Sequence, residues 1–259
     1  MTAYILYSVE NNVARIVLNR PEKFNSFNRE MALQLQSALD KAGNDKSVRA
    51  IFITGEGKAF CAGQDLAEAM DPNGPGIRRI VAEHYNPIIR KLRNLEKPVV
   101  CGVNGVAAGA GANLAFACDV VIASAGASFI QAFSKIGLVP DSGGTFMLPR
   151  LIGMQRASAL MMLGDKISAP DALSMGMLYK VCEEGKLIEE GLQIANTLSQ
   201  MPTRGIWLTK QLLNESMSNS LEEQLRREEE LQAAAGETSD YKEGVQSFLE
   251  KRKPVFKGE

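Results

Sequence analysis

The chain has one histidine, His84, and one tryptophan, Trp207, and its four cysteines show no C-x-x-C spacing. Structural zinc sites use closely spaced cysteine and histidine ligands, so we expect no metal centre. The cysteines do not form a disulfide-rich pattern either, which favours free thiols in a reducing compartment. A serine hydrolase would need a G-x-S-x-G turn, which is missing, and would have only His84 as its base.

Long apolar runs are missing as well. The first twenty residues contain no basic region followed by a long apolar stretch, and no segment approaches the length of a membrane span. The 29 Lys and Arg residues nearly balance the 30 Asp and Glu residues, which leaves a net charge of −1. Such a balance gives no general attraction to nucleic acid. We therefore expect a cytoplasmic protein with neither nucleic acid nor membrane as its partner.

Small residues dominate the segment 97–114, KPVVCGVNGVAAGAGANL. Its apolar part, residues 99–103, predicts a buried strand that turns at Gly105 and leads into a helix. The first amides of a helix have no partners within it, and no bulky side chain screens those near Gly109 and Ala110. The segment could thus bind a substrate oxygen, or its glycines could only let the helix pack closely on the strand. A dinucleotide site is excluded, because Leu114 stands where the third glycine of its motif would be.

A second segment has the same plan. Residues 48–54, VRAIFIT, predict a strand, and GEGKAFCAGQDL follows at 55–66. The backbone N–H of Gln64 follows the flexible Gly63 and could turn inward. Two amide donors from two loops could polarise one thioester carbonyl and stabilise the enolate formed beside it.

The remaining pattern predicts strands at 3–10 and 13–18, and a helix at 28–42 that Asn28 caps. A turn at 70–76 precedes a helix at 77–95 that bends near Pro87. Further strands are expected at 119–123 and 128–131, and further helices at 113–118, 145–151, 155–163 and 169–175. Since the pattern is helical from residue 186 on, we divide the chain into a core of mixed strands and helices, 1–182, and a helical region, 183–259.

Five sequence blocks resemble the crotonase superfamily of enoyl-CoA hydratases and isomerases, almost from end to end. In chain order they are LNRPEKFNSF, KAFCAGQDL, VNGVAAGAGANLAFACD, FSKIGLVPDSGGTFMLPRLIG and FLEKRKPVFKG. The resemblance implies an α/β crotonase (ClpP-like) fold, a spiral of strand–strand–helix turns followed by helices that build homotrimers or homohexamers. It also implies that the N–H groups of Gln64 and Ala110 form an oxyanion hole for an acyl-CoA thioester.

The hydratases of this family use two glutamates, and the matching positions here are Asn113 and Phe133. Neither side chain can transfer a proton as a carboxylate does. An acid does stand at Asp141, in VPDSGG, where an apolar setting would raise its pKa toward the range useful in acid–base work. Judged by its position alone, Asp141 is more simply a cap for the helix that follows.

With Asp141 in VPDSGG, and Asn113 and Phe133 in place of the acids, the chain is most similar to the ring-epoxide isomerases of phenylacetate degradation. Those family members convert 1,2-epoxyphenylacetyl-CoA into an oxepin and shift double bonds of enoyl-CoA thioesters. The resemblance implies that Asp141 moves a proton from one carbon to another. Phe129, Phe133 and Phe146 could line a pocket for a ring, or could simply pack in the core.

For the rest of the substrate, the resemblance implies contacts from the residues beside the two loops. They are Lys23, Phe24, Ala62, Asp65, Leu66, Gly109 and Asn113. Phe256 and Lys257 would reach the adenine and phosphate end from the C-terminus, either of the same subunit or of a neighbour. Coenzyme A is then part of the substrate, and we expect no separate cofactor.

Three other functions stay open. A hydratase would need another acid, such as Glu68, to replace the missing glutamates. An aromatic dehalogenase would use Asp141 as its nucleophile, but its pocket tryptophan is missing because Trp207 lies in the helical region. A non-catalytic acyl-CoA binder would have no use for Asp141. The residues favour an isomerase over all three.

Overall fold

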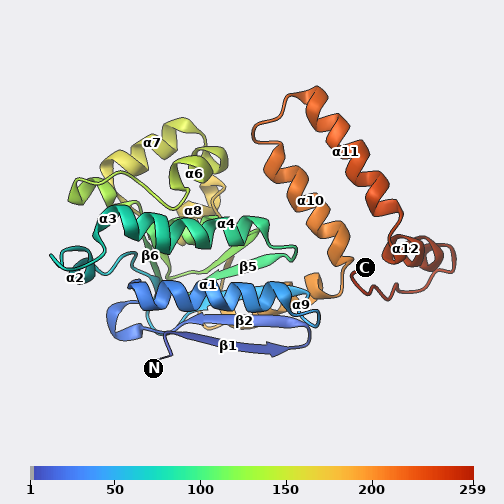
Figure 1. The fold of residues 1–259 in the computed structure, drawn as a ribbon, viewed down its shortest axis with the longest axis horizontal. Coiled ribbons are helices and arrows are strands. Elements are labelled where there is room, and N and C mark those ends of the chain that lie inside the picture. The colour runs from blue at the N-terminus through green and yellow to red at the C-terminus, as the bar shows by residue number, and fades with distance from the viewer. Residues whose placement is uncertain (1–2) are drawn as a thin grey trace.

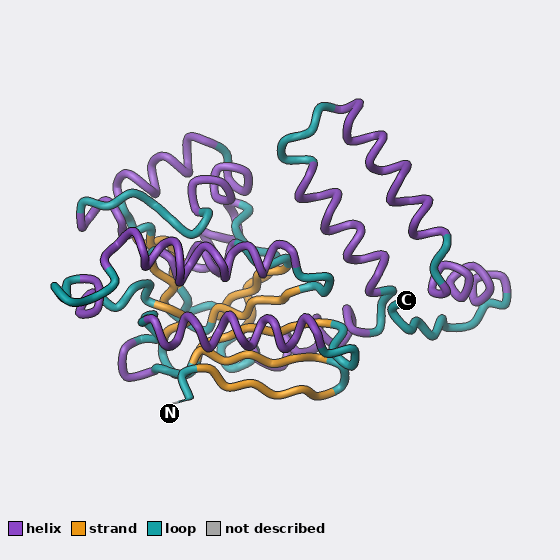
Figure 2. Tube along the Cα trace, viewed as in Figure 1, coloured by secondary structure: helices purple, strands orange, loops and turns teal. Residues whose placement is uncertain are grey.

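The strands of the computed structural model, which describes residues 3–259, form two sheets (Figures 1 and 2). The larger sheet has the order β1-β2-β3-β5-β7-β10, and the smaller has the order β4-β6-β8-β9. The strands of the larger sheet are β1 (Ile5–Glu10), β2 (Val13–Leu18), β3 (Ala50–Gly55), β5 (Val99–Val103), β7 (Val120–Ser124) and β10 (Lys180–Cys182). Those of the smaller sheet are β4 (Ala59–Cys61), β6 (Val106–Ala108), β8 (Ser128–Ile130) and β9 (Lys166–Ser168).

From β3 to β8, consecutive strands alternate between the two sheets. β3, β5 and β7 run parallel in the larger sheet, and each is followed by a strand of the smaller sheet, β4, β6 or β8. These three short strands are parallel to one another. The repeated turn of two strands and a connecting segment confirms the predicted crotonase fold.

Of the strands in the smaller sheet, only β8 was predicted from the sequence, as the strand expected at 128–131. The sequence analysis treated residues 55–66 as one loop and expected the turn at Gly105 to lead directly into a helix, whereas β4 and β6 lie in these segments. Each of them has only three residues, too few to show an alternating pattern. Their pairing with each other, which a sequence does not display, holds them in place.

Helices cover both faces of the larger sheet. In the core they are α1 (Arg29–Asn44), α2 (Leu66–Ala69), α3 (Gly76–Arg79), α4 (Asn86–Asn94), α5 (Ala110–Phe116), α6 (Gly144–Ile152), α7 (Met154–Leu163), α8 (Ala169–Met175) and α9 (Leu187–Ser199). Short 3₁₀ turns lie at Pro21–Lys23 and Ala132–Ile136. The Asn28 side chain accepts a hydrogen bond from the Met31 N–H, which confirms the predicted cap of α1.

The helix predicted at 77–95 is divided into three pieces. α3 passes into a π-helical turn, Ile80–Tyr85, and α4 then begins at Asn86. Pro87 has no N–H to continue the hydrogen bonds of the preceding helical turn, and Gln36 Nε2 donates to the Glu83 carbonyl instead (2.8 Å). The irregular turn therefore lies just before the proline, and it changes which side chains face inward.

The last strand ends at Cys182, but the helix that follows still belongs to the sheet. Ala195 of α9 is buried against Val13, Ala50, Phe52 and Val100. A side chain at Gly191 would lie 2.3 Å from the Phe52 ring, so only glycine lets α9 approach this closely. The division of the chain at residue 182 remains a prediction.

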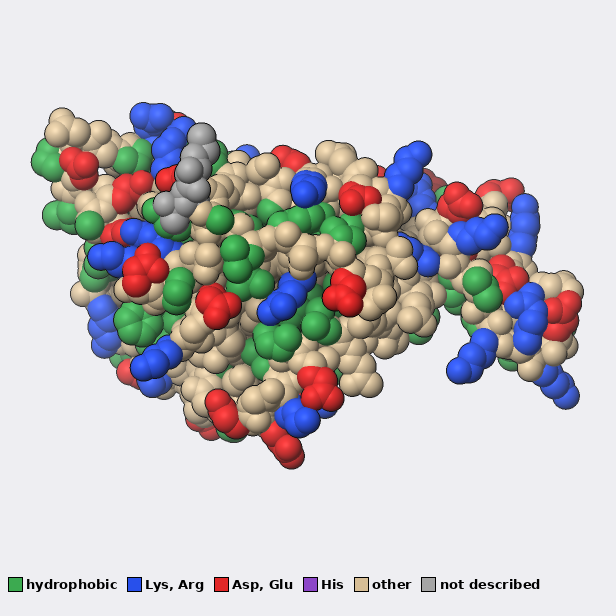
Figure 3. Space-filling model, turned by 90° about the horizontal axis from the view of Figure 1, so that it is seen from below, with side chains coloured by type: hydrophobic (Ala, Val, Ile, Leu, Met, Phe, Trp, Pro, Cys, Tyr) green, Lys and Arg blue, Asp and Glu red, His purple; other side chains and the backbone are tan. Residues whose placement is uncertain are grey.

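Three further helices form an arm that stands away from the core (Figure 1). They are α10 (Thr203–Glu215), α11 (Leu221–Gly236) and α12 (Ser239–Leu249). The buried Lys210 of α10 joins the arm to the core, since its Nζ donates to Asp119 (2.8 Å) and to the Leu92 carbonyl (2.7 Å). On the face shown in Figure 3, acidic and basic side chains are interspersed, so this face has no large field of one sign.

Candidate active site

A cavity of about 220 Å³ lies between the α2–α3 segment, the start of α5 and the loop before α6. Seven of the residues predicted to form the site line it. They are Ala62, Gln64, Leu66, Gly109, Ala110, Phe133 and Asp141. The fold thus brings together two loops and one acid that are far apart in the sequence.

The loop after β4 supplies the Gln64 amide. Its two neighbouring peptides are held by Phe27, whose N–H donates to the Gly63 carbonyl (2.7 Å) and whose carbonyl accepts from the Asp65 N–H (2.8 Å). Gly63 has a φ of 91°, a conformation that other residues rarely adopt. Within residues 3–259 no group accepts a hydrogen bond from the Gln64 N–H. This amide is therefore available to a ligand.

The loop after β6 supplies the Ala110 amide, which is the first of α5. Gly109 precedes it with a φ of 53°, and its own N–H donates to the Ile130 carbonyl (2.8 Å). The Ala110 N–H, in contrast, has no acceptor in the described part of the chain, as expected at the start of a helix. A Cβ on Gly63 would lie 3.7 Å from this nitrogen, so the two loops adjoin.

The glycine-rich segment was expected either to bind a substrate oxygen or to let the helix pack closely on a strand. The two roles fall on neighbouring residues, Ala110 and Gly111. A Cβ on Gly111 would lie 2.3 Å from the Cys61 carbonyl oxygen. Gly111 thus allows α5 to pack directly against β4. That close packing sets the position of Ala110 beside the Gln64 loop.

Asp141 is the only carboxylate lining the cavity in the described part of the chain. Burial raises its pKa, and a hydrogen bond from the Ser142 hydroxyl (2.8 Å) partly offsets the rise. The alternative role as a cap is wrong. Gly143 occupies the N-cap position of α6, and no side chain caps that helix. The Asp141 carboxylate is thereby left to the cavity.

Asn113 lies behind the cavity and holds the Asp141 loop. The side chain is fully buried, donates to the Asp141 carbonyl (2.9 Å) and accepts from Gln131 Nε2 (2.8 Å). The Asn113 side chain does not line the cavity, so in this conformation it does not make the contact with substrate that was predicted. In the structure Asn113 acts on the position of the acid.

Gly144 provides a test of this support. A Cβ there would lie 2.3 Å from Nδ2 of Asn113, so Gly144→Ala must push the amide away from the Asp141 loop. We expect a loss of about 1–3 kcal/mol in the free energy of unfolding, and a fall in kcat as Asp141 moves. Gly236→Ala, whose added Cβ meets nothing within 4 Å, is the control. It should leave turnover unchanged and should not lower the free energy of unfolding, because alanine favours a helix more than glycine does. An equal effect of the two variants in urea unfolding and in turnover would contradict this role.

Only one of the three phenylalanines considered for a ring pocket lines the cavity, and that one is Phe133. Phe129 is stacked on Phe116, with ring centroids 5.6 Å apart, and belongs to the core. Phe146 is 48% exposed and lies under the Arg150 guanidinium. The remaining apolar wall comes from residues that the sequence analysis did not select, namely Ala69, Ile77, Ile80, Val81, Tyr85, Ile136 and Leu138.

Glu68 does not face the cavity. Its Oε2 accepts from Gln64 Nε2 (2.8 Å), and its Oε1 accepts from the Arg29 N–H (2.8 Å). With both oxygens engaged, it is poorly placed to replace a catalytic glutamate. His84 is fully buried beside Arg29, and burial lowers its pKa.

Three of the residues expected to contact the rest of coenzyme A, Lys23, Phe24 and Asp65, do not line the cavity. The Phe24 carbonyl accepts from the Ala62 N–H (3.0 Å), and the Phe24 ring is 53% exposed beside Lys23. Asp65 pairs with Arg20 (2.8 Å). Burial opposes ionisation of Asp65, but the hydrogen bonds from Arg20 and the Ala67 N–H outweigh it and lower its pKa.

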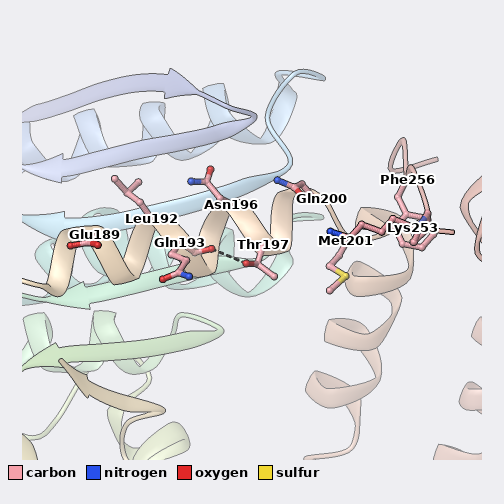
Figure 4. Close-up of a pocket in the computed structure, with 10 residues that line it drawn as sticks. Glu189, Leu192, Gln193, Asn196, Thr197, Gln200, Met201, Lys253 and Phe256 are labelled. Carbon is pink, nitrogen blue, oxygen red and sulfur yellow. Dashed lines mark hydrogen bonds between the residues drawn. The ribbon is translucent and has the colours of Figure 1, made fainter.

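Phe256 and Lys257 lie elsewhere. Figure 1 places the C-terminus and the α2–α3 segment at opposite ends of the molecule. Figure 4 shows Phe256 near Met201 and Gln200, in a separate groove beside α9. The Phe256 carbonyl accepts from Arg49 Nη1 (2.7 Å). Within one chain these two residues therefore do not reach the cavity.

All four cysteines are buried and none forms a disulfide, and burial raises the pKa of the Cys61 thiol to about 12. Between residues 3 and 259, no helix combines the length and apolar character needed to cross a bilayer.

Comparison with known proteins identifies the family to which this sequence is related. The sequence profile described as enoyl-CoA hydratase/isomerase matches residues 8–259. The 1,2-epoxyphenylacetyl-CoA isomerase of Escherichia coli K12 is 47% identical over the whole of both chains. The trans-2-decenoyl-[acyl-carrier-protein] isomerase of Streptococcus mutans is 40% identical, with 98% of each chain covered.

A solved structure shows the same fold. The enoyl-CoA hydratase of Bacillus anthracis superposes with a TM-score of 0.93 at 33% identity, over 99% of this chain and 100% of its own. With the profile matching nearly the full length and two relatives above 30% identity, the relationship covers both the core and the helical arm. The chain belongs to the enoyl-CoA hydratase/isomerase family, the crotonase superfamily, and is an enzyme of that superfamily.

Proposed function

We propose that this enzyme is an acyl-CoA isomerase that converts 1,2-epoxyphenylacetyl-CoA into its oxepin isomer and shifts the double bond of 3-enoyl-CoA to the 2 position. One observation carries the proposal. Among the residues that the structure describes, a single carboxylate, that of Asp141, lines the cavity that the free amides of Gln64 and Ala110 also line. Isomerisation needs one group that takes up and returns a proton, whereas hydration also requires a positioned water.

The chemistry follows from this arrangement. The two amides donate to the thioester oxygen, and Asp141 removes a proton from the carbon beside the carbonyl. The electrons of that C–H bond enter the thioester, whose enolate oxygen the amides stabilise. In a double-bond shift, protonated Asp141 then returns a proton to a carbon further along the acyl chain. No atom is gained or lost, and the carboxylate is restored.

The cavity supports a ring as the acyl group. An apolar cavity of about 150 Å³ can hold benzene, and the cavity of about 220 Å³ here leaves room for a short linkage to the thioester. The Phe133 side chain and the aliphatic wall suit an apolar ring. The name of the Escherichia coli relative points to the same substrate.

The direct test offers 1,2-epoxyphenylacetyl-CoA to the purified protein and follows the product by mass spectrometry and NMR. We expect a product of unchanged mass whose spectrum is that of a seven-membered oxepin ring. Two results would contradict the proposal. One is a product that has gained one water; the other is an epoxide left unchanged by an enzyme that rapidly hydrates a 2-enoyl-CoA.

The pH profile offers a second test through Ser142. Because Asp141 must be ionised to remove a proton, kcat/KM should fall as the pH drops through the raised pKa of Asp141. The Ser142 hydroxyl stabilises the ionised form, so Ser142→Ala should raise that pKa further. The acid limb of the profile should therefore move to higher pH. An unchanged limb would mean that another group limits the rate.

The assembly is part of the same proposal. The arm exposes apolar side chains that a lone subunit would leave in water, among them Leu221, Phe248 and Leu249. We propose that they are covered in a homotrimer or homohexamer, in which Phe256 and Lys257 approach the coenzyme A of a neighbouring subunit. Light scattering of the purified protein should give the mass of three or six chains, and the mass of one chain would contradict this.

A further inference from the structure

The side chain of Gln64 is held at both ends of its amide group. Its Oε1 accepts a hydrogen bond from the Tyr85 hydroxyl (3.0 Å), and its Nε2 donates to Glu68 Oε2 (2.8 Å). Tyr85 comes from a distant segment, whereas Glu68 lies four residues on, in α2. An amide that is bound from two sides cannot rotate without breaking a hydrogen bond.

Each of the two partners is itself fixed. Glu68 also accepts from the Arg29 N–H at the start of α1 (2.8 Å). The Tyr85 side chain is 1% exposed, and its ring lies against Phe27 with centroids 5.8 Å apart. Phe27 is the residue whose backbone holds the peptides on both sides of Gln64. Tyr85 therefore supports the Gln64 loop directly through its hydroxyl and indirectly through Phe27.

The π-helical turn explains why Tyr85 points this way. A π turn pairs residues five apart, so Tyr85 comes round to the same side as Ile80. Ile80, Val81 and Tyr85 all line the cavity as a result. An ordinary α-helix would direct positions 80 and 85 to different sides.

The loop needs such support because its own backbone is permissive. Gly63 precedes Gln64 with a positive φ, and glycine gives the least resistance to rotation. The Gln64 N–H has no partner of its own among residues 3–259. Without the side-chain contacts, only the two Phe27 hydrogen bonds would keep this N–H directed into the cavity.

We propose that Tyr85 is a positioning residue for the oxyanion hole. Together with Glu68, it holds the Gln64 amide side chain so that the Gln64 N–H stays aimed at the thioester oxygen. The inference rests on the proposed role of the two amides. Tyr85 takes no part in proton transfer in this account, since its hydroxyl donates to Gln64.

The test compares Tyr85→Phe with Tyr7→Phe. Both remove one phenol hydroxyl, but the buried hydroxyl of Tyr7 in β1 has no hydrogen-bond partner in the part of the chain that the structure describes. Tyr85→Phe should lower kcat about 10-fold with little change in KM, short of the ~10²–10³-fold cost of deleting an oxyanion donor. Tyr7→Phe should leave kcat unchanged. If Tyr85→Phe also leaves kcat unchanged, the proposal is wrong.

A double-mutant cycle separates positioning from direct contact with substrate. Gln64→Met keeps the backbone N–H but loses both side-chain hydrogen bonds, so it should lower kcat at least as much as Tyr85→Phe. If Tyr85 acts through Gln64, adding Tyr85→Phe to Gln64→Met should cost little more. Losses that multiply would overturn the proposal, because Tyr85 would then act independently of Gln64.

Spectroscopy measures the oxyanion hole directly. In an Asp141→Asn background, which we expect to bind without turnover, the C=O stretch of a bound ¹³C-labelled acyl-CoA reports the polarisation of the thioester. Tyr85→Phe should move this band to higher frequency, and Tyr7→Phe should not. If the wild-type enzyme hydrates and does not isomerise, the proposed function fails. The Tyr85 comparison is then made on the rate of hydration, because the same amides polarise the same carbonyl.

Discussion

Replacing Asp141 by asparagine is expected to abolish isomerisation. Asparagine has nearly the same shape but cannot take up a proton, so the loss should reach at least the ~10²–10⁴-fold that general acid–base catalysis contributes. Binding of the acyl-CoA should be nearly unchanged, since the two amides and the apolar wall remain. Turnover and binding can be measured on the same preparation, by product analysis and by calorimetry.

The stability of this variant should separate catalysis from folding. Burial raises the pKa of Asp141 in the folded state, so the folded protein holds the proton more tightly than the unfolded chain does. Ionisation therefore opposes folding at neutral pH, and the penalty grows as the pH rises from the unfolded pKa to the folded one. Asp141→Asn removes that penalty, and its thermal midpoint at neutral pH should equal or exceed the wild-type value.

Asp40→Asn makes the same chemical change on an exposed acid of α1 that pairs with Lys91, and it is the control. It should retain full turnover. Retained isomerisation in Asp141→Asn, or an equal loss in Asp40→Asn, would remove Asp141 from the mechanism.

The second large effect is expected from Ala110→Pro. Proline has no N–H, and the first position of a helix is the one where it fits best. Gly109 has a ψ of −125°, outside the α region that a following proline disfavours. The variant should therefore fold, yet lose one oxyanion donor and place its ring where the thioester oxygen would lie. We expect kcat/KM to fall by at least ~10²–10³-fold.

Met154→Pro is the matched control for this change. Met154 is the first residue of α7, follows a glycine with positive φ as Ala110 does, and is 68% exposed. Proline there should leave both turnover and the circular dichroism spectrum unchanged. If Ala110→Pro retained turnover with an intact spectrum, the Ala110 amide would not belong to the oxyanion hole.

The sequence was sufficient to predict the fold and the two loops that line the cavity, because those depend on motifs. Gly111 permits the close approach of α5 to β4, Gly109 has a positive φ, and Gln64 follows another glycine with positive φ. These local requirements are visible as residue types at fixed spacing. Asp141 needed the family resemblance, since its position alone favoured a helix cap that the structure does not contain.

Other parts of the site depend on contacts between distant segments. Tyr85 faces the cavity only because the helix widens to a π turn between Ile80 and Tyr85, for which no spacing rule exists. Phe129 and Phe146 could not be separated from Phe133 by composition, because all three are apolar and only tertiary packing selects one. Asn113 has the right position in the family pattern, but its amide is directed at the backbone of the Asp141 loop.

The most direct test of the single-carboxylate mechanism follows proton exchange during turnover. A 3-enoyl-CoA and a 2-enoyl-CoA are each incubated with the enzyme in deuterated water, and the products are analysed by mass spectrometry. The mechanism predicts interconversion of the two, with deuterium incorporated on carbon and no water added. Rapid formation of a 3-hydroxyacyl-CoA, with little double-bond shift, would contradict it and identify a hydratase.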